Sequence, residues 1–143
     1  MTTIILSQAR TMIAAAFERG SELKLQPLSV VVLDSGGHVK AFERQDGASN
    51  LRFEIAHGKA YGALGIGIGS RALMARAEQQ PWFVAAVNGA FGGALVPVPG
   101  GVLVRANDGE LIGAVGVSGD ASDNDELVAV AGIEAACFVA ETG

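Results

Sequence analysis

Two extended segments, each joined to a second one by a glycine-containing turn, constrain the fold of this chain most strongly. Residues Leu28–Leu33 read LSVVVL, and the turn Asp-Ser-Gly-Gly leads into Val39–Arg44. Residues Val102–Arg105 are followed by the turn Asn-Asp-Gly and then by Leu111–Val117. Glycine in such turns supplies the positive φ angles that tight connections between antiparallel strands require. The sequence therefore predicts two β-hairpins.

Apolar residues at helical spacing surround the two hairpins. The periodicity predicts helices over Thr3–Gly20 and Asn50–Gly62, and a shorter helix over Ser70–Gln80 that ends before Pro81. Trp82–Asn88 adds a further helical turn, and Asp123–Ala140 is the last predicted helix. The order helix, hairpin, helices, hairpin, helix predicts an α/β (α+β) fold in which helices pack against an antiparallel sheet.

Length and composition favour one domain that associates with copies of itself. The chain has 143 residues without a repeat or linker, so we expect a single domain over residues 1–143. Hydrophobic residues make up 50% of the chain and charged residues 17%, which is more apolar than an average soluble domain. Because identical subunits can cover surplus apolar surface, we expect a homo-oligomer.

Charge and hydropathy argue against two classes of partner. The net charge is −5 and no basic run is present, so a nucleic-acid partner is not expected. The apolar stretches are far shorter than the roughly 20 residues that span a bilayer, and the N-terminal residues do not have the order of a signal peptide. We therefore expect a cytoplasmic protein without a membrane partner, and a lone Cys137 agrees with a reducing compartment.

The glycines and the few metal-binding residue types exclude several common sites. Residues Gly65–Ser70 read GIGIGS, which lacks the spacing of a nucleotide-binding loop, so turns or close packing are favoured there. The chain has two histidines, His38 and His57, and one cysteine, which is too few for a structural zinc site within one chain. No Ser/His/Asp signature of a hydrolase is present.

The histidines remain candidates for chemistry. Glu54 and His57 are three residues apart on a predicted helix and so share a face. Such a pair could be an acid/base couple, a pair of metal ligands, or a haem ligand with the group that orients it. A surface pair without a function is the alternative. His38 lies in the first turn, where a solvated residue is the alternative to a ligand.

Polar residues and glycines near strand ends could hold a ligand. Arg44 ends a predicted strand, and with Lys59 it could clamp a carboxylate or propionate, although a structural Arg44–Asp46 pair is equally consistent. The segment Gly92–Gly101 contains four Gly and two Pro residues, which favours a rigid loop and a candidate ligand wall. Ser118 precedes the last predicted helix. The start of that helix could be an anion site, and capping of the helix by Ser122 is the alternative.

Four segments are together similar to the GlcG/HbpS (haem-degrading, DUF336) family. In chain order they are VVVLDSGGHVKAFERQDGAS, IAHGKAYGALGI, PVPGGVLVR and LIGAVGVSGDASDNDELVAVAGIEA, and they cover almost the whole chain. The resemblance implies a profilin-like fold with a five-stranded antiparallel sheet flanked by helices, and a homo-oligomer. It also implies a small-molecule ligand, since studied members bind haem. The pocket elements of the family would correspond to Arg44, Asp46, Lys59, Gly100, Gly101 and Ser118.

Three functions stay open from the sequence. The first is a small-molecule binding protein of the GlcG/HbpS type, with haem as the candidate ligand and with His57, then His38, as candidate ligands of the haem iron. The alternative is an enzyme acting on a small carboxylate or hydroxy acid in a catabolic pathway, in which His57 or Asp46 is the general base and Arg44 or Lys59 stabilises an anion. The third is an oligomeric scaffold without a functional pocket.

Overall fold

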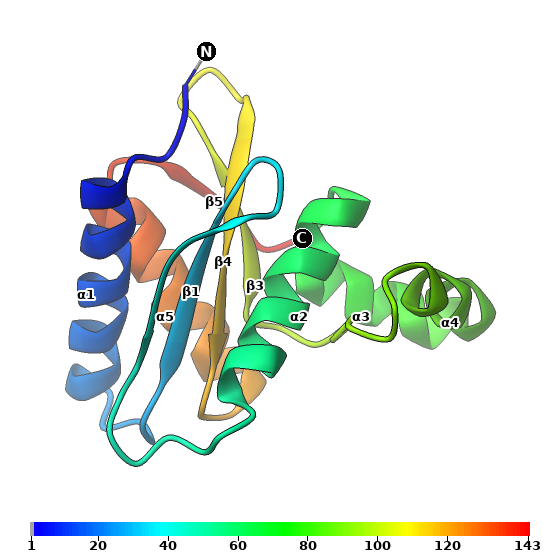
Figure 1. Ribbon diagram of the computed structural model, residues 1–143, viewed down its shortest axis with the longest axis horizontal. Helices are drawn as coiled ribbons and strands as arrows, with labels where there is room; N and C mark the ends of the chain where they lie inside the picture. The colour runs from blue at the N-terminus through cyan, green and yellow to red at the C-terminus, as the bar shows by residue number, and fades with distance from the viewer. Residues whose placement is uncertain (1) are drawn as a thin grey trace.

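The computed structural model describes residues 2–143, which form five helices and one five-stranded sheet (Figure 1). The elements in chain order are α1 (Leu6–Glu22), β1 (Ser29–Asp34), β2 (Val39–Arg44), α2 (Arg52–Ile66), α3 (Ser70–Gln79), α4 (Pro81–Ala90), β3 (Gly101–Arg105), β4 (Leu111–Ser118), α5 (Ser122–Ala135) and β5 (Val139–Glu141). The predicted α/β fold with a five-stranded antiparallel sheet is confirmed.

The strand order β2-β1-β4-β3-β5 places the two predicted hairpins side by side. Each hairpin pairs within itself, and β1 pairs with β4 so that Val30 lies opposite Val117 at the junction. The two central strands β1 and β4 are almost entirely buried, because helices cover both faces of the sheet. A strand that is buried on both faces is apolar along its whole length, which explains the continuous run in LSVVVL.

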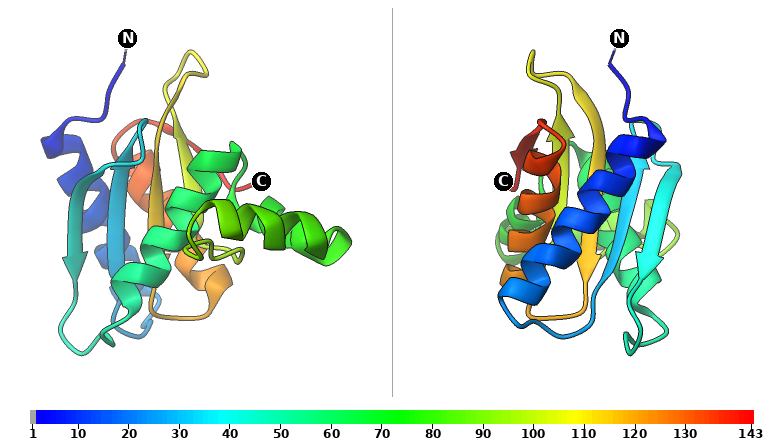
Figure 2. Two further views of the ribbon diagram at one scale, coloured as in Figure 1. Left: turned by 45° about the vertical axis from the view of Figure 1, so that its right-hand side comes forward. Right: turned by 90° about the vertical axis from the view of Figure 1, so that its left-hand side faces the viewer.

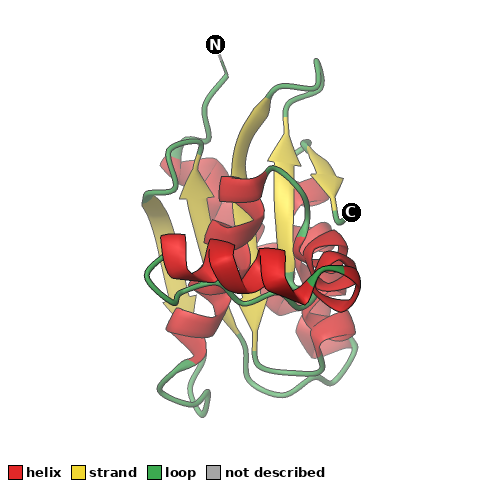
Figure 3. Cartoon of the chain, turned by 90° about the vertical axis from the view of Figure 1, so that its right-hand side faces the viewer, coloured by secondary structure: helices red, strands yellow, loops and turns green. Residues whose placement is uncertain are grey.

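The helices form a layer on each face of the sheet. Helices α1 and α5 lie side by side on one face, and α2 lies on the other, with α3 and α4 beyond it (Figures 2 and 3). Successive side chains of β1 point to opposite faces of the sheet. Val30 and Val32 pack toward α1 and α5, whereas Val31 and Leu33 pack toward α2. The α4 helix extends away from the sheet as an arm (Figure 1).

Close contact between α2 and the sheet depends on glycines in the strands. Gly101 of β3 lies opposite Gly116 of β4, and a Cβ atom on either one would meet the backbone of α2. The helix backbone therefore lies directly on the sheet at this point. This contact places the side chains on the outer face of α2 at the surface of the molecule, where they can meet a ligand.

Several predicted helix boundaries are wrong for reasons of packing. Helix α1 begins at Leu6 and continues through Gly20, because Gly20 packs closely against Leu28 and does not end the helix. Helix α2 continues past Gly62 to Ile66, since the glycines in it accommodate side chains of the loop that follows α4.

The end of the chain also differs from the prediction. The predicted helix over Asp123–Ala140 ends at Ala135, and Cys137 has a left-handed φ of 64° that turns the chain. Residues Val139–Glu141 then form β5 on the edge of β3. The apolar residues near the C-terminus thus cover a sheet edge, which removes unpaired backbone groups from solvent.

Candidate functional site

A hollow of about 380 Å³ lies between the first turns of α2 and the glycine-rich loop that follows α4. We call it the α2 hollow, and its lining is mostly apolar, with His57 and Glu54 as the titratable groups. Its volume lies within the range of about 300–1,000 Å³ that is usual for small-molecule sites. The lining residues are Leu51, Phe53, Glu54, Ile55, His57, Gly92, Gly93, Ala94 and Val96.

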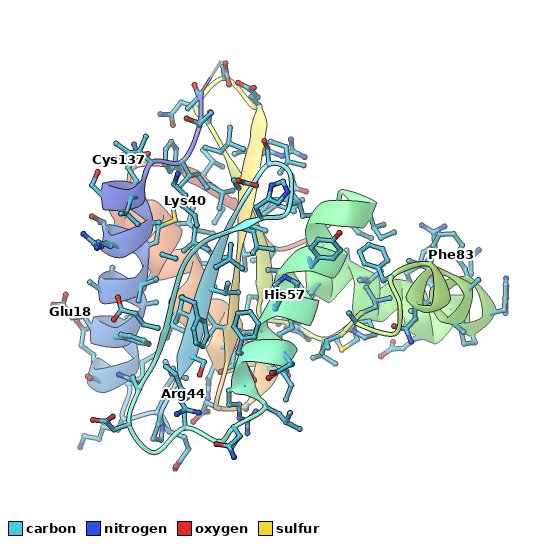
Figure 4. All side chains as sticks on the ribbon, in the orientation of Figure 1. Glu18, Lys40, Arg44, His57, Phe83 and Cys137 are labelled. Atoms are coloured by element: carbon cyan, nitrogen blue, oxygen red, sulfur yellow. The ribbon has the colours of Figure 1, made fainter. Side chains whose placement is uncertain are left out.

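The imidazole of His57 belongs to a row of five rings that we call the aromatic row. The rings stack on His57 from both sides along α2, with centroid distances of 5.5 Å to Phe53 and 5.3 Å to Tyr61. Phe42 of β2 meets Phe53 edge-on at 4.7 Å, and Phe91 meets Tyr61 edge-on at 5.2 Å. The row forms because residues four apart share a helix face, and His57 lies near its centre on α2 (Figure 4).

The surroundings of His57 favour a neutral imidazole. Burial lowers the pKa of His57, because a charged ring is poorly solvated there. No ion pair joins it to Glu54 within the described part of the chain, so the predicted carboxylate–imidazole couple is not formed. A neutral imidazole has a free lone pair on one ring nitrogen. Such a lone pair can bind a metal ion.

The glycine-rich loop is fixed as the opposite wall of the α2 hollow. The Val96 amide donates to the Gly58 carbonyl oxygen at 3.3 Å, and the Leu95 amide donates to Asn88 Oδ1 at 3.0 Å. Ala94 and Val96 line the α2 hollow, whereas Leu95 points to a separate apolar hollow beside α4. Residues 92–94 and Val96 of this segment thus line the α2 hollow, and their role as a ligand wall stays a prediction. Gly58, which holds the loop at Val96, carries no signal in the sequence that would single it out.

Lys59 is not available for the predicted clamp. Its side chain is 3% exposed, and Nζ donates to the Val117 carbonyl oxygen at 2.9 Å and to Asp125 Oδ2 at 3.1 Å. Burial lowers the pKa of Lys59 and raises the pKa of Asp125. Arg44 lies at the far end of β2, well separated from His57 (Figure 4). The structure therefore does not bring Arg44 and Lys59 together as free groups at one hollow, because the ammonium group of Lys59 is already bonded in the interior.

Gly100 and Gly101 pack against Lys59 instead of facing a hollow. Gly100 has a φ of +123°, and a Cβ atom there would lie 2.8 Å from the Val117 carbonyl oxygen and 2.9 Å from Lys59 Nζ. Both glycines are buried. Their residue type is thus explained by the close approach of the loop to α2 and β4, and a direct contact with ligand would need this packing to open.

Arg44 and Asp46 border a second hollow, of about 540 Å³, below the end of β2. Both residues are exposed, and no ion pair joins them among residues 2–143, so the predicted structural pair is absent. Arg44 Nη1 instead lies 3.5 Å from Asn50 Oδ1. The lining is Phe17, Ser21, Leu25, Pro27, Glu43, Arg44, Gln45 and Asp46, without a histidine.

Ser118 is buried beside Arg52, for which no sequence pattern indicated a role. Its hydroxyl oxygen accepts a hydrogen bond from Arg52 Nη1 at 3.0 Å. The nearby start of α5 is not a free anion site, because Asp120 Oδ1 accepts the Ala121 amide and Asp125 Oδ1 accepts the Asp120 amide. Ala121, and not a serine, is the N-cap of α5. Carboxylates already at this helix start disfavour a second anion.

His38 is located apart from the aromatic row. It lies in the turn between β1 and β2, its side chain is 82% exposed, and Nδ1 is 3.3 Å from Asp34 Oδ1. This is the solvated turn arrangement that the sequence left open. No cluster of three or more His, Cys, Asp or Glu side chains suited to a metal ion occurs among residues 2–143, and none of the helices described there is long and apolar enough to cross a membrane.

Comparisons with known proteins agree with this fold. A family model described as "Haem degrading protein HbpS-like" matches residues 4–134. The crystal structure of a PduOC:haem complex has a TM-score of 0.85 and 25% identity to the chain, covering 96% of this chain and 97% of that one.

Two further crystal structures are similar to the chain. Klebsiella pneumoniae protein ORFY, of family DUF336, has a TM-score of 0.86 and 27% identity over 96% of this chain and 92% of that one. HbpS has a TM-score of 0.79 and 28% identity over 94% of this chain and 90% of that one. No curated protein is significantly similar to the chain in sequence.

Proposed function

The chain belongs to the HbpS-like family, and from this membership we propose that it is a small-molecule binding protein whose ligand is haem. The proposed site is the α2 hollow, where His57 would hold the haem iron. The observation that carries the proposal is the position of a half-buried imidazole at an apolar hollow that is large enough for a small-molecule ligand. Haem would supply an iron centre for redox or small-ligand chemistry.

Similarity to a protein crystallised with haem supports the choice of ligand. The chain matches the PduOC:haem complex over nearly the full length of both proteins. The α2 hollow is bordered by Phe53 on one side and by Val96 on the other, and such apolar groups suit the flat faces of a porphyrin. Of the two histidines, His57 lines the α2 hollow, so it takes precedence over His38 as the proposed ligand.

The alternative of an enzyme acting on a small carboxylate receives no specific support. Of its proposed base and cation residues, only Asp46 and Arg44 share a hollow, and both are exposed there. His57 is at the α2 hollow, and Lys59 is buried against Asp125. Catalysis of that kind needs the base and the anion-stabilising group within reach of one substrate. Among the described residues, the lining of the α2 hollow contains no Lys or Arg to stabilise an anion beside His57, so binding is the function that we favour for this hollow.

We also propose that the chain forms a homo-oligomer through the arm made by α4. This helix contains no charged residue, and Val84 is its one buried side chain within the structure described. Trp82 is 69% exposed on the same helix. An apolar surface that extends away from the body of the protein is typical of a contact between subunits.

A titration of the purified protein with haemin tests the proposed ligand. We expect a saturable Soret shift with a fixed stoichiometry, which a control protein without a haem site would not reproduce. His57→Ala should abolish the axial signature of a histidine in the haem spectrum, whereas the matched variant His38→Ala should retain it. A spectrum that is unchanged in His57→Ala, or a titration without saturation, would show that the proposal is wrong.

A further inference from the structure

We propose that Phe53 and Tyr61 are positioning residues that set the plane of the His57 imidazole at the α2 hollow. A metal-binding histidine is commonly oriented by a hydrogen bond from its second ring nitrogen to a carboxylate or carbonyl oxygen. In this chain, two stacked rings take the place of that hydrogen bond. The inference deepens the proposed haem function, and the orientation itself can be tested without haem.

The stacking geometry restricts the imidazole on both of its faces. The ring planes of Phe53 and His57 differ by 28°, and those of Tyr61 and His57 differ by 17°. Rotation of the imidazole about its Cβ–Cγ bond would break the stacking with both neighbouring rings. The face of the ring is thus covered, and its edge, which carries the two nitrogens, remains as the part that can reach a ligand.

No polar group orients the His57 imidazole in the part of the chain that the structure describes. Within residues 2–143, none of the side-chain hydrogen bonds or ion pairs involves a ring nitrogen of His57. Burial is the cause of the shift in its pKa, which agrees with an imidazole that lacks a hydrogen-bonded partner. Glu54 lines the same hollow without pairing with the ring. Packing alone therefore determines how the imidazole lies.

The two flanking rings are themselves held in place. Tyr61 is fixed by a T-shaped contact with Phe91 and by Gly37, whose missing Cβ would lie 2.7 Å from the tyrosine ring. Phe53 is fixed by the edge of Phe42 on β2. Gly37 has a φ of +82°, so both its backbone and its lack of a side chain suit this position. The aromatic row is therefore anchored to the sheet and to the loop after α4.

Nuclear magnetic resonance of the apo-protein tests the orientation directly. Protons above the face of a neighbouring ring resonate upfield, so the His57 ring signals are expected upfield of those of His38, whose side chain is 82% exposed. Phe53→Leu and Tyr61→Leu should each move the His57 signals toward those of His38. Tyr61→Phe should leave them in place, because the ring and not the hydroxyl makes the contact.

A matched control separates orientation from general packing. Phe83→Leu removes a ring on α4 that lies outside the aromatic row and packs against Arg76, and it should leave the His57 signals unchanged. Urea unfolding of each variant shows which ones keep the fold. His57 signals that stay upfield in both folded leucine variants of the aromatic row would overturn the inference.

Resonance Raman spectroscopy of the haem-loaded protein is a second test of the His57 orientation. The iron–histidine stretching band in the resonance Raman spectrum should be sharp in the wild type, broadened or shifted in Phe53→Leu and Tyr61→Leu, and restored in Tyr61→Phe. An unchanged band in both leucine variants would overturn the inference. A wild type that does not bind haem would overturn the proposed function, while the signals of the apo-protein would still decide the role of the two rings.

Discussion

Lys59 Nζ lies 3.1 Å from Asp125 Oδ2, so that one buried ion pair joins helices on opposite faces of the sheet. Lys59 belongs to α2 and Asp125 belongs to the first turn of α5. Both side chains are almost completely buried, at 3% and 1% exposed. Val117, the residue before the end of β4, accepts a hydrogen bond from Lys59 Nζ, so the pair links both helix layers to the same end of this strand.

Breaking this pair should destabilise the protein strongly. Lys59→Met or Asp125→Asn leaves one buried charge without its partner, which costs about 3–5 kcal/mol. The double variant should be about 2 kcal/mol more stable than the sum of the single losses predicts, because neither charge then remains alone. Urea unfolding measures all three. Arg19→Ala, which removes an exposed pair with Glu22, is the control and should change stability by under about 1 kcal/mol. If the loss of stability in the double variant equalled the sum of the two single losses, Lys59 and Asp125 would not be coupled.

The pH dependence of haem binding should reflect a low pKa of His57. The pKa of a free histidine is about 6.5, and burial lowers that of His57. The imidazole thus stays neutral as the pH falls through 6.5, and the iron–histidine bond should be lost only at a lower pH. A titration of the Soret spectrum, with His57 followed by nuclear magnetic resonance in the apo-protein, measures this. Protonation of His57 at or above pH 6.5 would contradict the prediction.

The lowered pKa of His57 should also make the stability of the protein depend on pH. Between the lowered pKa of folded His57 and the ordinary value near 6.5, the unfolded chain binds the proton more readily than the folded chain. The contribution of His57 to stability is therefore present above pH 6.5 and decreases as the pH falls toward the folded pKa. Comparison of wild type with His57→Gln by urea unfolding at several pH values isolates this contribution. A difference that does not vary over the acidic range would show that burial does not act on His57.

Gly58→Ala should deform the wall of the α2 hollow. A Cβ atom there would overlap the carbonyl oxygen of Ala94 and lie 2.6 Å from Val96 Cγ2, so the loop must move. We expect a loss of about 1–3 kcal/mol in stability and a haem affinity lower by about tenfold. Gly89→Ala is the control, since no heavy atom lies within 4 Å of the added Cβ, and it should stabilise its helix by about 0.5–1 kcal/mol. Equal haem affinities in the two variants would mean that Gly58 does not shape the site.

Trp82→Glu tests the proposed contact between subunits. A charge on the apolar surface of α4 should shift the sedimentation of the protein to a smaller species, because a buried unpaired carboxylate disfavours association. Leu127→Glu, at a side chain that is 51% exposed on α5, should leave the assembly unchanged. A wild type that sediments as a monomer at low concentration would refute the homo-oligomer itself.

The sequence by itself determined the parts of the fold that depend on local chemistry. Both hairpins were predictable because a turn with glycine at positive φ follows each β-branched run, and the register extends from the turn. The order of helices and hairpins gave the fold class, and short motifs indicated the family. The spacing of Phe53, His57 and Tyr61 by four residues was also visible in the sequence and could have revealed a shared helix face.

Only the tertiary structure decided which residues far apart in the chain come into contact. Lys59 lies 66 residues from Asp125 in the chain, and no local pattern shows that the ammonium group turns inward to a carboxylate instead of outward to a ligand. Phe42 and Phe91 reach the aromatic row from β2 and from the end of α4. Residues Val139–Glu141 form a strand because an edge of β3 is free to pair with them. Long-range packing sets these contacts, since side-chain burial depends on the whole fold whereas turns and helices depend on near neighbours.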